Sequence, residues 1–125
     1  MTTVYLTVAE VLAIHEDQIE RYGGGAGVRD MGQLEAALFR PQTGYYPDNI
    51  AEAAALWESL SQNHPFIDGN KRTAFAVTFT FLAVNGVNIT ADEQRLMKFL
   101  LPLYEHSALS FEKLEAFLRK NTTVQ

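Results

Sequence analysis

Residues 73–84, TAFAVTFTFLAV, decide the fold class of this chain. Apolar side chains would surround almost every side of a helix built on this run, which is typical of a helix enclosed by other helices. The β-branched and Phe residues also suit a buried strand, but the run exceeds the usual length of a strand. Asn85-Gly86 then supplies a left-handed turn that ends a helix. The run therefore predicts a central, buried helix from about Asn70 to Asn85.

Cap and stop signals predict further helices in the rest of the chain. The candidate N-caps are Thr7, Asp30, Asp48 or Asn49, Thr90 and Ser110, and the helices that follow them cover residues 8–22, 31–40, 50–63, 91–108 and 111–120. Thr90 with Glu93 has the spacing of a capping box, and Pro102 is expected to kink or divide the helix that follows. The pattern predicts an all-α fold, a compact bundle of about six helices around a central apolar helix, with residues 1–125 as a single domain.

The composition argues against several classes of protein. A chain of 125 residues with 47% hydrophobic content can bury one core without disulfide or metal staples. The net charge of −5 argues against direct binding of nucleic acid, and the absence of cysteine excludes thiolate zinc sites and disulfides. No apolar run approaches the roughly 18 residues of a membrane span, and the N-terminus lacks the positive region of a signal peptide. We therefore expect a soluble, cytoplasmic protein.

Residues 63–75, NHPFIDGNKRTAF, place two cations where the central helix begins. A helix N-terminus carries unpaired N–H groups and the positive end of the macrodipole, so it favours anions. Lys71 and Arg72 in the first turn oppose that dipole, at a cost of about 0.3–1 kcal/mol each. The placement makes sense if a phosphate lies over this helix end, where Lys supplies a point charge and Arg a bidentate fork.

The neighbouring residues suit the same chemistry. Asp68 is a hard oxygen ligand of the kind that binds Mg²⁺ together with substrate phosphates, and His64 has a pKa near neutrality, as a general base requires. Gly69 lets the backbone approach a ligand closely, and Asn70 can cap the helix or donate to an oxygen. The residues alone leave a second interpretation open, a structural turn in which Asp68 pairs with a neighbouring cation.

Residues 64–74, HPFIDGNKRTA, strongly resemble the signature loop of the Fic/Doc (Fido) family, whose pattern is His-x-Phe-x-(Asp/Glu)-(Gly/Ala)-Asn-(Gly/Lys)-Arg. Resemblance to the Doc (death-on-curing) branch continues through RYGGGAGVRD (21–30), FRPQ (39–42) and FLAVNG (81–86). Fic-type adenylyltransferases carry Gly and a second Arg at the positions of Lys71 and Phe75, so both positions favour Doc. Family members are compact all-helical domains that transfer part of a nucleoside triphosphate to a protein hydroxyl.

The resemblance implies a Doc-like toxin of a toxin–antitoxin module. Such toxins use ATP and Mg²⁺ to phosphorylate a threonine of elongation factor Tu, which inhibits translation, and a cognate antitoxin polypeptide restrains them. The implied roles are His64 as catalytic base, Asp68 as Mg²⁺ ligand, Phe66 as loop anchor, and Gly69, Asn70, Lys71 and Arg72 as the nucleotide phosphate cradle.

Two alternatives stay open at this point. One is a Fic-type adenylyltransferase, which transfers AMP to a protein hydroxyl. The other is a catalytically silent Fido-fold module that binds a partner protein, because Gln62 and Ala76 stand where Doc has Arg and Asn. The sequence has no Ser/Thr-x-x-x-Glu-(Gly/Asn) string of a self-silencing Fic helix. Restraint of a toxin is therefore expected from another polypeptide, docked as a helix beside the site.

Three weaker signals remain. GGGAG over residues 23–27 ends a helical pattern instead of following a strand, so we interpret it as a C-cap and mobile connector, not a phosphate loop. Tyr45 and Tyr46 form a possible target-docking loop by resemblance to Fic proteins, with ordinary packing of the rings equally open. His15 and His106 lack metal-ligand spacing and are expected to be core or surface histidines.

Overall fold

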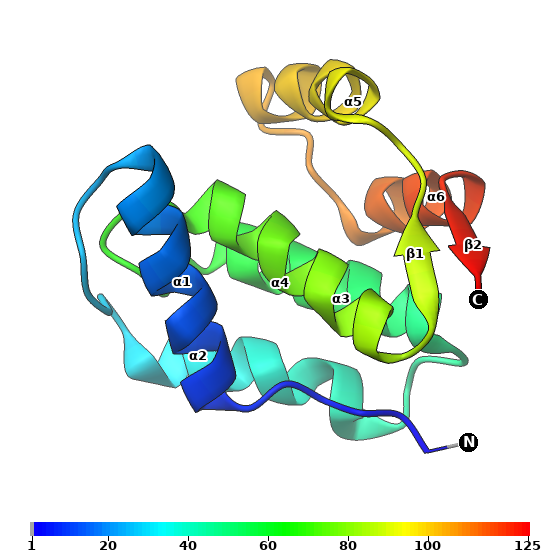
Figure 1. Cartoon of the computed structure of the whole chain (residues 1–125), viewed down its shortest axis with the longest axis horizontal. Helices are drawn as coiled ribbons and strands as arrows, with labels where there is room; N and C mark the ends of the chain where they lie inside the picture. Colours follow the sequence, from blue (N-terminus) through cyan, green and yellow to red (C-terminus); the bar gives the residue numbers. More distant parts are fainter. Residues whose placement is uncertain (1) are drawn as a thin grey trace.

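The computed structural model describes residues 2–125, and that part of the chain folds into six α-helices and one small sheet (Figure 1). The helices are α1 (Val8–Tyr22), α2 (Met31–Phe39), α3 (Asn49–Gln62), α4 (Asn70–Val84), α5 (Glu93–Glu105) and α6 (Phe111–Lys120), with a 3-10 helix η1 (Arg40–Thr43) after α2. Strands β1 (Val87–Ile89) and β2 (Thr122–Val124) pair antiparallel. The all-α prediction is confirmed. No helix in residues 2–125 is both long enough and apolar enough to span a membrane.

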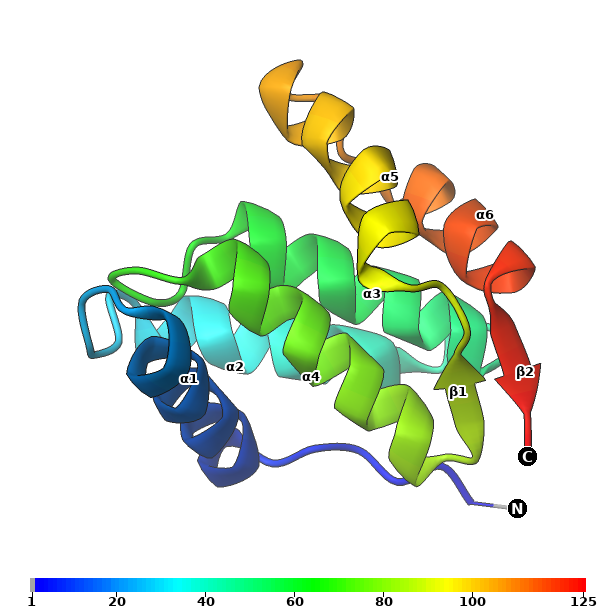
Figure 2. The same cartoon turned by 45° about the horizontal axis from the view of Figure 1, so that its top comes forward.

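Helices α3 and α4 pack against each other at the centre of the molecule (Figure 2). α2 and α6 pack on α3, and α1 packs on α4. The Trp57 ring of α3 is fully buried and lies 5.5 Å from the Phe75 ring of α4 and 6.2 Å from the Phe117 ring of α6, measured between centroids. This aromatic cluster joins the three helices.

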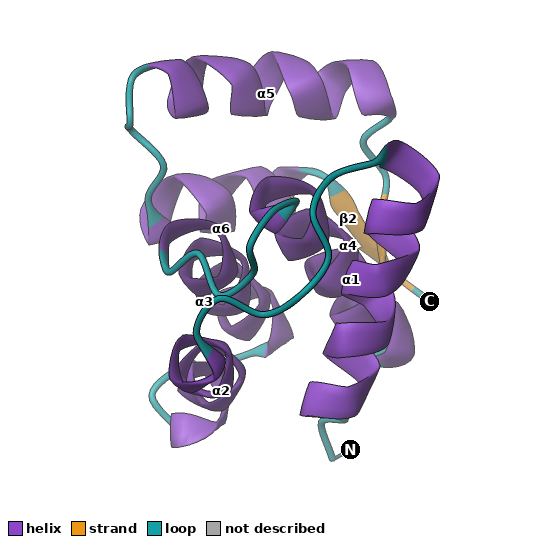
Figure 3. Cartoon of the chain, turned by 90° about the vertical axis from the view of Figure 1, so that its left-hand side faces the viewer, coloured by secondary structure: helices purple, strands orange, loops and turns teal. Residues whose placement is uncertain are grey.

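The most enclosed helix is α3, and the prediction that α4 is enclosed on all sides is wrong. Every residue of the stretch Ala51–Trp57 of α3 is buried, whereas Phe79 and Val84 of α4 are 45% and 48% exposed. Small alanine side chains let neighbouring helices approach α3 closely from several directions. α5 is an outer helix of the molecule (Figure 3).

The small sheet was missed because each strand has only three residues. Its ladder continues through a hydrogen bond of 2.7 Å from Thr90 N to Asn121 O. Thr90 therefore belongs to the end of the sheet, and its prediction as an N-cap is wrong. The cap of α5 is Asp92, whose side chain accepts a hydrogen bond from Arg95 N. Pro102 lies within α5 and does not divide it.

Candidate functional site

The loop between α3 and α4 is held by the loop between α1 and α2, and both lie at the end of the molecule shown at the left of Figure 1. Val28 and Phe66 form an antiparallel β-bridge, and Ile67 N donates to Gly27 O at 3.1 Å. The Arg29 side chain donates to the backbone oxygens of His64 at 2.6 Å and Asn63 at 2.8 Å. Arg29 thus fixes the backbone on which the candidate base sits.

Phe66 fastens the centre of this loop to the core. Its ring is 1% exposed and stacks on the ring of His15 in α1, with centroids 3.8 Å apart and planes at 5°. His15 Nε2 also lies 2.8 Å from the backbone oxygen of Asp68. The Asn70 side chain accepts from Phe66 N at 2.9 Å and donates to Phe66 O at 3.0 Å. Asn70 therefore shapes the loop instead of capping α4, and His15 is a core histidine.

The N-terminus of α4 has no side-chain cap. Gly69 precedes the helix with φ +73°, and a Cβ built there would lie 3.0 Å from Ile19 Cδ1, so both the backbone angle and the space favour glycine. The side chains of Thr7, Asp30, Asp48, Asp92 and Ser110 cap the other five α-helices. Because the first N–H groups of a helix lack intrahelical partners, α4 alone among these helices leaves them to an external acceptor.

The Asp68 carboxylate is oriented by backbone donors. Oδ2 accepts from Gly25 N at 3.1 Å and Oδ1 accepts from Gly69 N at 2.8 Å. These bonds, first the one from Gly25, hold the pKa of Asp68 below its ordinary value. A Cβ at Gly24 would lie 2.8 Å from Asp68 Oδ2. The glycine run is therefore a wall of the site as well as the C-cap of α1, a role that its sequence interpretation missed.

The two cations of the motif leave α4 in different directions, and neither forms an ion pair with Asp68. Arg72 Nη2 donates to Gly23 O at 2.8 Å, and the guanidinium lies 5.6 Å from the Tyr22 ring centroid. Arg72 thus occupies the C-terminal, partially negative end of α1, which offsets its unfavourable place on α4. Lys71 Nζ instead lies 4.5 Å from the Tyr104 ring centroid of α5. The second interpretation of the sequence, a structural turn in which Asp68 pairs with a neighbouring cation, is therefore wrong.

A pocket of about 560 Å³ lies between these groups. Tyr22, Gly23 and Gly24 line one side, and His64 with residues 67–72 lines the other. The pocket brings together every predicted catalytic, metal-binding and phosphate-binding residue, with the anchor Phe66 buried beneath, and its volume is typical of small-molecule sites. His64 is exposed and has a left-handed backbone, with φ +47°. A second pocket of about 550 Å³, which includes Arg95 and Lys98, contains none of the predicted site residues.

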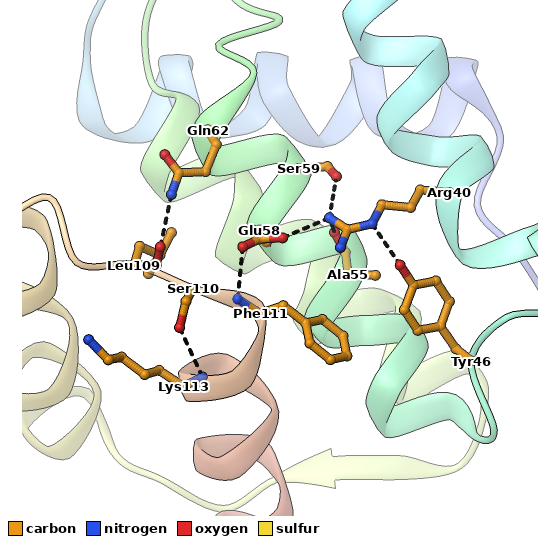
Figure 4. Close-up of polar contacts among 10 residues, drawn as sticks. All are labelled: Arg40, Tyr46, Ala55, Glu58, Ser59, Gln62, Leu109, Ser110, Phe111 and Lys113. Atoms are coloured by element: carbon orange, nitrogen blue, oxygen red, sulfur yellow. Dashed lines mark hydrogen bonds and ion pairs between the residues drawn. The ribbon is translucent and has the colours of Figure 1, made fainter.

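Tyr45 and Tyr46 lie away from this pocket. They precede α3, whereas His64 follows it, and a helix of 14 residues is about 20 Å long. Tyr46 Oη accepts from Arg40 Nε at 2.7 Å, and its ring lies 5.6 Å from the Phe111 ring (Figure 4). Tyr46 is thus packed, whereas Tyr45 is 82% exposed, and the docking loop stays a prediction. The segment that borders the site is instead residues 23–30.

Gln62, one of the departures from the Doc pattern, does not line the pocket and contacts the connection between α5 and α6. Its Nε2 donates to Leu109 O at 3.0 Å, in the connection between α5 and α6 (Figure 4). One turn earlier on α3, Glu58 accepts from Arg40 Nη1 at 2.8 Å and from Phe111 N at 2.8 Å. Gln62 therefore helps to dock the C-terminal segment on α3.

Comparison with known proteins agrees with this geometry. Residues 5–82, more than half of the chain, match the model of the Fic/DOC family, and the chain belongs to that family. It is 53% identical over 76 residues to "Toxin Doc" of Mycolicibacterium smegmatis, an alignment that covers 57% of this chain and 58% of that protein. It is also 34% identical over 89 residues to "Protein kinase doc" of Escherichia phage P1, covering 68% and 71%. The chain thus spans less than two thirds of the first relative, and the resemblance to the Doc branch is confirmed.

Proposed function

We propose that the protein is a Doc-type toxin that transfers the γ-phosphate of ATP to a protein hydroxyl and so inhibits translation. One observation carries the proposal: a single pocket holds His64, the ionised Asp68 and an uncapped helix N-terminus that bears Lys71. The names of the two relatives, one a toxin and one a protein kinase, support the same activity.

His64 would accept the proton of the attacking hydroxyl. The hydroxyl oxygen then bonds to the γ-phosphorus, the bond from that phosphorus to the bridging oxygen breaks, and ADP leaves. The N–H groups of the first turn of α4, together with Lys71, would offset the charge on the phosphate oxygens, and Arg72, which donates to Gly23 O, would add positive charge beside them. Arg29 keeps the His64 backbone in place during this transfer.

The donor set fits Mg²⁺ bound together with a nucleotide. Each Asp68 oxygen accepts one backbone hydrogen bond and has further lone pairs, and the lowered pKa keeps the carboxylate ionised. Residues 2–125 contain no group of three His, Cys, Asp or Glu side chains that could hold an ion, so phosphate oxygens and waters would supply its other ligands. When bound, Mg²⁺ neutralises charge on the transferred phosphate.

The target and the restraining partner follow from the family resemblance. We propose a threonine of elongation factor Tu as the acceptor and a cognate antitoxin polypeptide as the inhibitor. Phe79 of α4 and Met97 and Leu101 of α5 are between 40% and 48% exposed. Such apolar side chains offer contact area to an amphipathic helix of a partner.

The proposal is tested with purified elongation factor Tu, Mg²⁺ and ATP labelled on either the γ- or the α-phosphate. We expect γ-label on the target and no α-label, and we expect the γ-label to be lost when EDTA removes Mg²⁺. Transfer of α-label would contradict phosphorylation and favour the adenylyltransferase alternative.

A catalytically silent binding module is the second candidate, and one observation favours it. Two of the predicted phosphate ligands are already engaged within the chain, since Asn70 bonds the Phe66 backbone and Arg72 bonds Gly23 O. Calorimetry with Mg²⁺ and ATP separates the two candidates, because a silent module need release no heat.

A further inference from the structure

We propose that Tyr104 of α5 is a positioning residue of the candidate site, whose ring holds the Lys71 ammonium at the pocket so that it meets the nucleotide phosphates. The inference rests on the proposed function. Tyr104 lies beyond residues 5–82, the part of the chain that matches the family model. The contact joins the C-terminal part of the chain to the signature loop.

The geometry is that of a cation–π contact. Lys71 Nζ lies 4.5 Å from the Tyr104 ring centroid, inside the distance of about 6 Å over which a ring attracts a cation. Within residues 2–125, Lys71 forms no ion pair. A lysine side chain is long and loses much rotamer freedom when it is ordered. The Tyr104 ring restricts Lys71 before nucleotide binds. Nucleotide binding therefore costs less side-chain entropy.

Tyr104 itself is held in place. It packs against the hydrophobic core, and its Oη lies 3.4 Å from Oγ of Ser61, near the end of α3. Burial raises the pKa of Tyr104, so the hydroxyl stays protonated near neutral pH. α5 runs from β1 back toward the end of the molecule where α4 begins (Figures 1 and 2). The ring is thus held between Ser61 near the end of α3 and Lys71 at the start of α4.

The type of contact decides what Lys71 can still do. Arg72, the next residue, also lies over a tyrosine ring, that of Tyr22, but its guanidinium donates to Gly23 O and is committed to α1. A carboxylate partner would neutralise a lysine and occupy its donors. A ring face holds the ammonium by its quadrupole and leaves the charge and the N–H groups available. Of Lys71 and Arg72, Lys71 is therefore the one that is held in position and still able to bind phosphate.

The first test examines the contact without any catalysis. In NMR spectra, the ring current of Tyr104 should shift the ε-methylene protons of Lys71 upfield. Tyr104→Leu should abolish that shift, while Tyr104→Phe and the control Met97→Ala should keep it. Met97 lies two turns earlier on α5, about 10 Å along the axis. A Lys71 signal that is the same in Tyr104→Leu and wild type overturns the proposal. If Tyr104→Leu does not fold, Tyr104→Met replaces it.

The second test separates positioning from mere structure. Tyr104→Leu should raise KM for ATP roughly 2- to 30-fold with a smaller change in kcat, and Tyr104→Phe should restore KM to within about twofold. A purely structural role would lower kcat through loss of folded enzyme and leave KM unchanged, which overturns the proposal. In a Lys71→Ala background, Tyr104→Leu should not change KM for ATP further. If Tyr104→Leu raises KM as much in that background as in the wild type, the proposal is overturned.

The two proposals fail differently. If the wild type transfers no phosphate but binds Mg²⁺ and ATP, the proposed kinase function fails, and the dissociation constant from calorimetry takes the place of KM in the comparison of Tyr104 variants. If the wild type binds no nucleotide, the positioning role fails as well.

Discussion

The N-termini of α3 and α4 make opposite use of the same backbone groups. At α3, Asp48 caps the helix by accepting from Ala51 N at 2.9 Å, and Glu52 adds a negative charge in the first turn. At α4, Gly69 offers no cap, and the first turn carries no acid. An anion at a helix N-terminus stabilises the helix, so Asp48 and Glu52 stabilise α3. α4 leaves that interaction to a ligand, and this is where the candidate site lies.

The difference also explains how the chain tolerates two misplaced cations. Arg72 is compensated by the carbonyl end of α1 and Lys71 by an aromatic ring of α5. Both compensations come from helices distant in sequence. Contacts with α1 and α5 therefore stabilise the two cations at the N-terminus of α4. Substitutions at the N-termini of α3 and α4 test the difference between these two helix ends.

Removing the proposed base should have the largest effect. His64→Ala should lower phosphate transfer by roughly 10²- to 10⁴-fold, because general-base catalysis contributes about that much. The side chain is exposed, so the thermal unfolding midpoint should stay near that of the wild type. His106→Ala, at the exposed end of α5, is the matched control and should leave transfer unchanged. Undiminished transfer by His64→Ala would mean that the uncapped end of α4 does no such chemistry.

Removing the cap of α3 should weaken the fold. Asp48→Ala should lower the free energy of unfolding by about 0.5–2 kcal/mol, since Ala51 N loses its acceptor. The exposed ion pair from Asp48 to Arg119 adds little. Urea denaturation measures the change, and Arg119→Ala serves as the control for the ion pair. Equal losses in Asp48→Ala and Arg119→Ala would show that the cap is not what stabilises α3.

Giving α4 an acidic first turn, such as those of α1, α3, α5 and α6, should sharpen the contrast. Lys71→Glu should raise the free energy of unfolding by about 0.3–1 kcal/mol through the helix dipole, less what the Tyr104 contact contributes. The same change should weaken binding of Mg²⁺ and ATP. Urea denaturation and calorimetry measure the two effects, and Lys71→Gln isolates loss of charge from its reversal. A Lys71→Glu protein that binds nucleotide as tightly as the wild type would contradict the phosphate-cradle role.

The smallest expected effect concerns pH. The pKa of Asp68 is lowered in the folded protein, mainly by the Gly25 and Gly69 N–H groups, from an ordinary value of about 3.8. Its contribution to stability is therefore present above that value and is lost as the pH falls through the lower folded value. The urea midpoint of the wild type should fall more steeply than that of Asp68→Asn as the pH drops below about 5. Parallel pH profiles would show that these backbone donors do not favour the carboxylate.

Sequence reasoning succeeded where the signal is local. Thr7, Asp30, Asp48 and Ser110 cap helices as expected, because a cap needs only a side chain and an N–H group within one turn. It failed at Thr90, where a hydrogen bond with Asn121 draws the residue into the sheet. That partner lies far along the chain, so no window around Thr90 could reveal it.

The same division holds for the candidate site. The signature over residues 64–72 placed the base, the carboxylate and the cations in one loop, and the structure lines one pocket with them. It did not show that Arg29, 35 residues earlier, holds the His64 backbone, or that His15, 53 residues before Asp68, touches that loop. The part of the resemblance over residues 21–30 was the one signal that pointed to Arg29.

The sequence by itself determined the helices, four of their caps and the set of reactive side chains, because periodicity, capping and the family motif act over a few neighbouring residues. The tertiary structure decided which helix is enclosed, which loop forms the second wall of the pocket and where the two cations point. Those outcomes depend on packing between segments far apart in sequence. Lys71 and Arg72 are adjacent in the chain, yet one lies against α5 and the other against α1.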